Sequence, residues 1–270
     1  TGLRVNYWFL MAISGLMLVG GLVAIIFFVR TNIMANKKIA ETAEAKRPAN
    51  LEIISISDAS CTDCFNINQV LTYIKQENVT VTTEKTLSNT SEEGKQLIQQ
   101  FAIKKLPALI LKGELDKLPK LADFFAQAGD MANDTFVFRQ PGAPYTMVDS
   151  GTVRGRVQLT LLSDVGCTTC YDVTQHETIL QRNFGITVPA KVLDAKSAAG
   201  RAFIKKYNIT LVPTFVLTGE PNEYSSLTEA WQDVGTIAAD GAYIFTGVPL
   251  MGTYHNLLTN KTITPSTTQP

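Results

Sequence analysis

Four cysteines occur in this sequence as two pairs with the same spacing. Cys61-Thr62-Asp63-Cys64 and Cys167-Thr168-Thr169-Cys170 each place two thiols around two intervening residues. Thiols at this spacing can act as a dithiol–disulfide couple, in which the first attacks a disulfide and the second resolves the mixed disulfide. We therefore predict Cys61 and Cys167 as nucleophiles, and Cys64 and Cys170 as the resolving thiols.

Each CxxC motif stands between two predicted elements of secondary structure. The apolar runs 51–56 and 157–162 precede the motifs and are predicted strands, and apolar residues at helical spacing follow them. A thiol in the first turn of a helix is stabilised as a thiolate by unpaired amides and by the helix dipole. The sequence therefore predicts a lowered pKa for the first thiol of each pair.

The soluble part of the chain repeats itself. The second CxxC follows the first after 106 residues (61 to 167), and the same offset relates Gly, Pro and Lys positions without a gap. Register kept over about 85 residues indicates a duplicated unit. We predict two domains of one kind, at 50–142 and 155–250. The predicted order in each is strand, CxxC, helix, strand, helix, strand, strand and helix, with the place of the last helix left open, giving an α/β fold with a mixed sheet flanked by helices.

A proline also recurs at a fixed distance from each motif. Pro107 lies 46 residues after Cys61, Pro213 lies 46 residues after Cys167, and each begins an apolar strand. With these features the chain resembles the thioredoxin superfamily over both repeats. The resemblance implies tandem thioredoxin-like folds, cis bonds before both prolines, and pairing of a substrate strand with the backbone of the preceding residue. The substrate-binding residues that it implies are Leu106, Pro107, Val212 and Pro213.

Acidic residues close to the motifs are predicted to modulate the thiols. Asp58 and Asp164 each lie three residues before the first cysteine, and Asp63 lies inside the first motif, where the second has Thr169. A carboxylate beside Cys61 disfavours its thiolate, so we expect the first site to be the more reducing one. The chain departs from the family in having no Trp before either CxxC. The direction of exchange is therefore not predicted.

The predicted function is thiol–disulfide exchange with protein substrates. The alternative is a redox-inert thioredoxin-fold subunit of a membrane assembly, with structural disulfides. A zinc or iron–sulfur site shared by the two motifs is disfavoured, because they belong to separate repeats. Haem attachment requires His after the second cysteine, where Phe65 and Tyr171 stand. We predict no metal and no cofactor.

The N-terminal region is predicted to anchor the chain in a membrane. Asn6 to Val29 contains no charged residue, and about 20 apolar residues suffice for a helix to cross the hydrocarbon layer. A transmembrane helix at 6–30 is favoured over a signal peptide, whose apolar region is shorter. A helical stalk or linker at 31–49 and a flexible polar tail at 256–270 complete the predicted organisation.

The charge of the chain limits its partners. Lys plus Arg and Asp plus Glu both number 24, so the formal net charge is zero, which argues against nucleic-acid binding. Basic residues after residue 29 favour a cytoplasmic soluble part by the positive-inside rule. Membrane-anchored relatives in the resembled superfamily instead favour an extracytoplasmic one, and this is the location we expect. The expected partners are protein thiols and disulfides, the membrane and a membrane redox protein.

Overall fold

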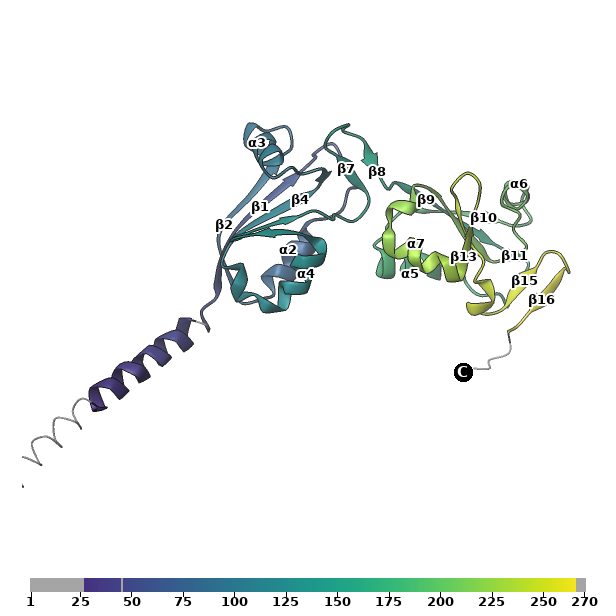
Figure 1. The fold of residues 1–270 in the computed structure, drawn as a ribbon. Coiled ribbons are helices and arrows are strands. Elements are labelled where there is room, and N and C mark those ends of the chain that lie inside the picture. Colours follow the sequence, from purple (N-terminus) through teal and green to yellow (C-terminus); the bar gives the residue numbers. More distant parts are fainter. Residues whose placement is uncertain (1–26, 45, 266–270) are drawn as a thin grey trace, which may run out of the picture.

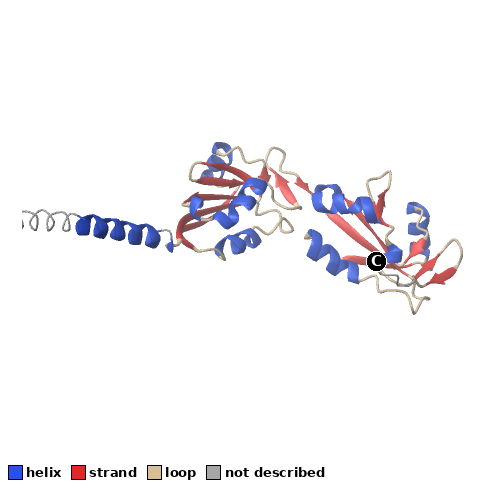
Figure 2. Ribbon diagram, turned by 60° about the horizontal axis from the view of Figure 1, so that its bottom comes forward, coloured by secondary structure: helices blue, strands red, loops and turns tan. Residues whose placement is uncertain are grey.

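Two α/β units follow one another along the chain (Figure 1). The structure is a computed structural model that describes residues 27–44 and 46–265. Each unit contains a five-stranded mixed sheet with helices on its faces (Figure 2). The fold class predicted from the sequence is therefore confirmed for the two α/β units.

The sheet of the first unit has the strand order β2-β1-β4-β6-β5. Strands β1 and β2 are parallel, and the remaining neighbours are antiparallel. The strands are β1 (Ala49–Ser57), β2 (Val79–Ser88), β4 (Ala108–Gly113), β5 (Gly129–Ala132) and β6 (Thr135–Phe138). The helices are α2 (Asn68–Lys75), α3 (Glu92–Gln100) and α4 (Ala122–Ala128), with the short 3₁₀ helices η1 (Leu115–Lys117) and η2 (Pro119–Leu121).

Alternating side chains of β1 build two core layers, one on each face of the sheet. Ile53 packs in the layer that includes α2 and α4, whereas Ile54 packs in the layer of α3, because successive strand residues point to opposite faces. Helix α3 begins after Ser91, whose hydroxyl accepts a hydrogen bond from the Gly94 amide at 3.1 Å. The helix that follows the first CxxC, α2, therefore belongs to the layer built on Ile53.

The second unit repeats this architecture with the strand order β10-β9-β12-β14-β13. Strands β9 and β10 are parallel, and the other neighbours are antiparallel. The strands are β9 (Val157–Ser163), β10 (Ala190–Asp194), β12 (Thr214–Gly219), β13 (Gly235–Ile237) and β14 (Tyr243–Phe245). The helices are α5 (Gln175–Phe184), α6 (Ala198–Tyr207) and α7 (Ser225–Val234), with η3 (Pro221–Glu223) and η4 (Val248–Leu250).

The structure shows the place of the last helix, which the sequence left open. Helices α4 and α7 come before the two outer strands of their sheets. Phe125 of α4 packs with Leu71 and Ile74 of α2. The apolar face of the sheet needs a covering helix, and a helix that enters before the outer hairpin covers it equally well.

A small three-stranded sheet accompanies each unit. In the first, the order is β3-β7-β8, and in the second it is β11-β15-β16. We term the pair β7–β8 strap hairpin 1 and the pair β15–β16 strap hairpin 2. The strands are β3 (Lys105–Leu106), β7 (Tyr145–Met147), β8 (Val153–Arg154), β11 (Leu211–Val212), β15 (Tyr254–Asn256) and β16 (Lys261–Ile263).

Strap hairpin 2 corrects the prediction of a flexible tail from residue 256. Asn256 pairs with Leu211 and with Lys261, so the chain continues in ordered strands as far as Ile263. The polar composition suggested a tail, but in a short edge hairpin the backbone hydrogen bonds supply the order, and polar side chains suit its exposed face.

Residues 27–44 form an exposed helix that leads into β1 (Figure 1). The end of this segment is joined to the first unit by ion pairs, with Arg47 binding Glu114 at 2.5 Å and Lys117 binding Glu44 at 2.6 Å. In the part of the chain that the structure describes, no helix combines the length and the apolar character needed to cross a membrane. The transmembrane helix predicted at 6–30 lies mostly outside the described residues.

Candidate functional site

Both CxxC motifs are closed as disulfides. The Cα atoms of Cys61 and Cys64 are 5.4 Å apart, and those of Cys167 and Cys170 are also 5.4 Å apart. All four predicted redox residues are therefore paired as the sequence spacing suggested.

The sequence predicts the first cysteine of each pair in the first turn of a helix, but neither Cys61 nor Cys167 lies there. The amide of Cys61 donates to the Asp58 carbonyl at 3.1 Å, and that of Cys167 donates to the Asp164 carbonyl at 2.9 Å, so each motif occupies a turn. Helices α2 and α5 begin several residues later, at Asn68 and Gln175. The helix dipole acts mainly within the first turn, and its effect on the first thiol is correspondingly smaller than predicted.

The residue after each CxxC forms a backbone hydrogen bond to the segment just before a strap hairpin. The amide after the first motif, that of Phe65, donates to the Pro144 carbonyl at 2.7 Å, and the amide of Tyr171 donates to the Thr253 carbonyl at 2.9 Å. These bonds direct the chain toward the neighbouring segment before it turns into the helix. The segment that precedes each strap strand therefore contacts the residue that follows the CxxC.

Leu106 and Val212, the residues before the two recurring prolines, are paired with the chain's own strands. Leu106 lies opposite Thr146 of β7, and Val212 lies opposite His255 of β15. The bonds Leu106-Pro107 and Val212-Pro213 are cis, as the resemblance implied. The backbone expected to bind a substrate strand thus already has a strand beside it, supplied by each strap hairpin.

Thr146 connects the first disulfide to Asp58. Its hydroxyl donates to Asp58 Oδ2 at 3.0 Å, and Thr146 Oγ1 also lies 3.6 Å from Cys64 Sγ. Asp58 also accepts hydrogen bonds from the hydroxyl and amide of Ser60, at 2.7 and 2.9 Å. The Ser60 hydroxyl is the main cause that holds the pKa of Asp58 below its usual value. A carboxylate therefore lies one hydroxyl away from the resolving sulfur.

Asp164 occupies the corresponding place in the second unit and is bound by a histidine. Its buried carboxylate lies 2.6 Å from His255 Nδ1 and 3.1 Å from Lys196 Nζ. Burial alone would raise the pKa of Asp164, but the hydrogen bonds from His255 and Lys196 outweigh it and lower the pKa. No motif in the sequence marks His255, and the structure places it against the second site.

Asp63, inside the first motif, forms an ion pair with Arg156 at the start of the second unit. The guanidinium binds both carboxylate oxygens at 2.8 Å, and Asp63 Oδ1 lies 3.5 Å from Cys61 Sγ. The hydrogen bond from Arg156 lowers the pKa of Asp63. Because the charges of the pair cancel, the expected destabilisation of the Cys61 thiolate is offset in this structure.

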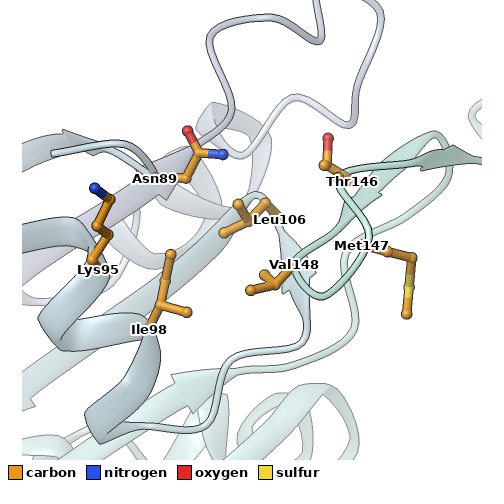
Figure 3. A pocket seen from close by; sticks show the side chains of 8 residues that line it. Asn89, Lys95, Ile98, Leu106, Thr146, Met147 and Val148 are labelled. Atoms are coloured by element: carbon orange, nitrogen blue, oxygen red, sulfur yellow. The ribbon is translucent and has the colours of Figure 1, made fainter.

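The first disulfide opens onto a cleft of about 430 Å³. Leu106 also lines a separate cavity of about 230 Å³, and Figure 3 shows Thr146 and Leu106 at its wall, with Met147 directed away. The residues that line the cleft include Ser55, Asp58, Cys61, Cys64, Leu106 and Pro107.

Among residues 27–44 and 46–265, no cluster of three or more His, Cys, Asp or Glu side chains could hold a metal.

Sequence reasoning found the cysteines and prolines but missed Thr146, His255 and Arg156. Thr146 and His255 are 109 residues apart, whereas the repeat has an offset of 106. The strap hairpins therefore fall out of the register that revealed the repeat. Arg156 corresponds to Asn50 at the repeat offset, so no repeated signal marked it.

Comparison with known proteins gives only remote similarities. No protein-family model matches the chain, and no curated protein matches it. A mutant of the alkylhydroperoxide reductase AhpF from Enterococcus faecalis is 16% identical, with 69% of this chain and 90% of that chain covered and a TM-score of 0.22. The NTD_N/C domain of the same protein is 14% identical, with 73% and 98% covered and a TM-score of 0.20.

A protein disulfide oxidoreductase from Aeropyrum pernix is 14% identical, with 72% of this chain and 89% of that chain covered and a TM-score of 0.18. TM-scores this low carry no argument about this chain, so the assignment rests on its own architecture. Two CxxC disulfides, each between a central strand and a helix, support a redox role. The strand order of both sheets, with a CxxC disulfide beside a proline-led strand in each, agrees with the two tandem thioredoxin-like folds expected from the sequence.

Proposed function

We propose that this chain is a membrane-anchored thiol–disulfide oxidoreductase that exchanges disulfides with protein substrates at both CxxC sites. The observation that carries the proposal is the open cleft at the first site, which is lined by Cys61, Cys64 and Pro107. A sulfur that lines an open cleft beside a carboxylate and a hydroxyl is accessible to another sulfur and has a route for its proton.

The proposed reaction is a two-electron exchange. In the reduced protein, the Cys61 thiolate attacks one sulfur of a substrate disulfide, the substrate S–S bond breaks, and the leaving thiolate takes up a proton. Cys64 then gives up its thiol proton, attacks Cys61 Sγ and releases the second substrate thiol. The protein dithiol is thereby oxidised to a disulfide and the substrate disulfide is reduced to two thiols. Cys167 and Cys170 act in the same way, and a substrate dithiol reverses the reaction.

A disulfide-reduction assay tests this activity. The reduced full chain is mixed with insulin, and the thiols released per molecule are counted for the parent and for Cys61→Ser/Cys64→Ser and Cys167→Ser/Cys170→Ser variants. We expect each double variant to retain part of the exchange and the fourfold variant to retain none. A parent chain no faster than the fourfold variant would exclude exchange with this substrate.

A redox-inert scaffold is the second candidate. The pairing of Leu106 with β7 and of Val212 with β15 favours it, because both backbone edges expected to bind substrate are occupied. Alkylation of the cysteines after treatment with a mild dithiol separates the two functions. Disulfides that stay closed at the potential of a thioredoxin pool support the scaffold, and thiols that appear and exchange support the oxidoreductase.

Membrane anchoring and an extracytoplasmic location form the remaining part of the proposal. The uncharged stretch from Asn6 to Val29 supports an anchor, as do Phe27 and Phe28, which are 71% and 69% exposed on the helix that leads into β1. We expect the soluble units on the outer side, close to a membrane redox protein. Protease treatment of oriented vesicles tests this: digestion of the units from the outer side agrees with the proposal, and their protection from it excludes this location.

A further inference from the structure

The strap hairpins place one side chain at the same point of each unit. Thr146 lies opposite Leu106, and His255 lies opposite Val212, so both stand beside the residue that precedes the recurring proline. Both also bind the Asp located three residues before the first cysteine of their unit, Asp58 in one case and Asp164 in the other. Two units with different local sequences therefore build the same contact.

Continuous contacts lead from the resolving sulfur to a carboxylate in the first unit. Cys64 Sγ lies 3.6 Å from Thr146 Oγ1, and this hydroxyl donates to Asp58 Oδ2 at 3.0 Å. Thr146 is only 1% exposed, so bulk water competes little for these contacts. In the reduced protein the Cys64 thiol has a hydroxyl oxygen within reach as acceptor, and that hydroxyl has a carboxylate as its own acceptor.

We propose that Thr146 is a catalytic residue of the first site, which passes the proton of the Cys64 thiol to Asp58 when Cys64 attacks the mixed disulfide. The inference rests on the proposed exchange function and adds a residue to it. As the Cys64–Cys61 bond forms and the bond from Cys61 to the substrate breaks, the thiol proton moves to Thr146 Oγ1 and the hydroxyl proton moves to Asp58. The substrate sulfur leaves as a thiolate and is protonated by solvent, so charge and protons balance.

The second unit replaces the hydroxyl with an imidazole. His255 Nδ1 lies 2.6 Å from Asp164 Oδ2, and its cross-strand partner Thr262 lies 4.0 Å from Cys167 Sγ. His255 is thus held by Asp164 on the strap strand beside the second disulfide. The two sites therefore differ in the group that the strap supplies, although their cysteine spacing is identical.

Charged groups from the surrounding elements bear on the pH dependence of the first site. Lys95 of α3 lines the cavity that Thr146 also lines, and Asp63 is neutralised by Arg156 in the turn of the motif. Asp58 is bound by Ser60 and Thr146, both of which are uncharged. Asp58 is thus the carboxylate that accepts a hydrogen bond from Thr146, whose hydroxyl lies next to Cys64 Sγ.

The test isolates the resolution step in the full chain. In a Cys167→Ser/Cys170→Ser background, the reduced protein reacts with oxidised glutathione, and rapid quenching separates formation of the Cys61 mixed disulfide from its resolution. We expect Thr146→Val to slow resolution about tenfold, so that the mixed disulfide accumulates. The rate of resolution in this variant should rise only at higher pH. Thr146→Ser keeps the hydroxyl and should restore the parent rate, and Met147→Leu on the same strand is the matched control.

A double-mutant cycle separates proton transfer from a general effect on folding. Asp58→Asn should slow resolution as Thr146→Val does, and the combined variant should be no slower than either one. Resolution at the parent rate in Asp58→Asn or in Thr146→Val overturns the inference. If Thr146→Val does not fold, the resolution rates of Asp58→Asn and Thr146→Ser test the inference instead. A parent chain that never forms the mixed disulfide instead removes the proposed function, so the two failures are distinguishable.

Discussion

At the scale of single residues, the ion pair of Asp63 with Arg156 sets the charge beside the first nucleophile. The pair is about half exposed, with side-chain exposures of 49% and 56%, so its energy is small. It nevertheless removes the net negative charge that the sequence analysis placed next to Cys61. The more reducing character predicted for the first site is therefore expected chiefly when Arg156 is absent.

Substitution of Arg156 tests this balance. In Arg156→Gln, the unpaired Asp63 carboxylate disfavours the Cys61 thiolate, and the reduced form becomes less stable. We expect the first site to become more reducing by about 10 to 20 mV, measured by redox titration with the second motif changed to Ser. Asp63→Asn/Arg156→Gln serves as the control and should return to the parent potential. A shift toward a more oxidising potential would contradict the argument.

His176 is buried among aromatic side chains in the second unit. Its ring centroid lies 4.5 Å from that of Phe215 and 4.7 Å from that of Phe245, and Tyr171 Oη lies 3.2 Å from its Nε2. Burial lowers the pKa of His176 to about 4. The first unit has Val70 at the corresponding position, which agrees with a packing role rather than a catalytic one.

The lowered pKa of His176 predicts acid sensitivity. Because the unfolded chain binds a proton at about pH 6.5 and the folded chain only near pH 4, this contribution to stability is complete above pH 6.5 and is lost as the pH falls toward 4. We expect the His176 contribution to the free energy of unfolding to fall by about 2 kcal/mol between pH 7 and 4.5. Denaturant unfolding measures it, and His176→Val should show a pH dependence weaker by that amount. An unchanged slope in the variant would refute the assignment.

At the scale of elements, the strap hairpins decide what can approach each proline-led strand. Besides the ladder pairs, the Val148 amide donates to the Lys104 carbonyl at 2.9 Å, and the Leu257 amide donates to the Thr210 carbonyl at 2.8 Å. These bonds extend the pairing beyond the two-residue strands β3 and β11. A substrate strand that uses the same edge has to displace the hairpin and replace these bonds.

Hydrogen exchange tests whether the hairpins stay paired. We expect the amides of Val148 and Leu257 to exchange about a hundredfold more slowly than that of exposed Thr168 in the CxxC turn, because exchange requires the hairpin to open. Mass spectrometry or NMR of the oxidised full chain measures this, and the α6 helix provides the fully protected reference. Exchange as fast as that of Thr168 would mean that the edge is open to substrates.

Periodic elements were predictable, and short ones were not. The second helix predicted after the CxxC of the second unit is present as α6, because apolar positions recur over several turns. Strands of two or three residues, such as β3 and β15, are too short to show a period. Strap hairpin 1 therefore lies between the two predicted domains, and strap hairpin 2 lies largely within the predicted tail.

At the scale of the whole molecule, two acidic residues in and just before η3 bind the segment that joins the two units. Glu223 accepts a hydrogen bond from the Tyr145 hydroxyl at 2.5 Å and one from Arg154 at 2.8 Å, and Glu220 binds the Gly155 amide at 2.7 Å. Burial and the contact with Glu223 raise the pKa of Tyr145 to about 12. Tyr145 belongs to strap hairpin 1, so the strap of the first unit is bonded to the second unit.

Loss of this contact should destabilise the chain. Glu223→Gln removes one of the two carboxylates that pair with Arg154, the other being Glu220, and it weakens the bond from Tyr145. We therefore expect the free energy of unfolding to fall by about 1 kcal/mol. Denaturant unfolding at low and high salt measures the effect, and the difference from the parent should shrink in about 1 M salt, on the scale expected from screening. Exposed Glu229→Gln is the matched control, and an equal loss in both variants would show that the contact contributes nothing.

Residue types and their spacing are sufficient to reveal the two CxxC pairs, the prolines 46 residues beyond them and the duplication of the unit. Which side chains surround the sulfurs depends instead on how the chain folds. Thr146, His255 and Arg156 reach Cys64, Asp164 and Asp63 across separations of 82, 91 and 93 residues. Such contacts depend on the path of the intervening chain and on the register of short strands, which no local pattern encodes.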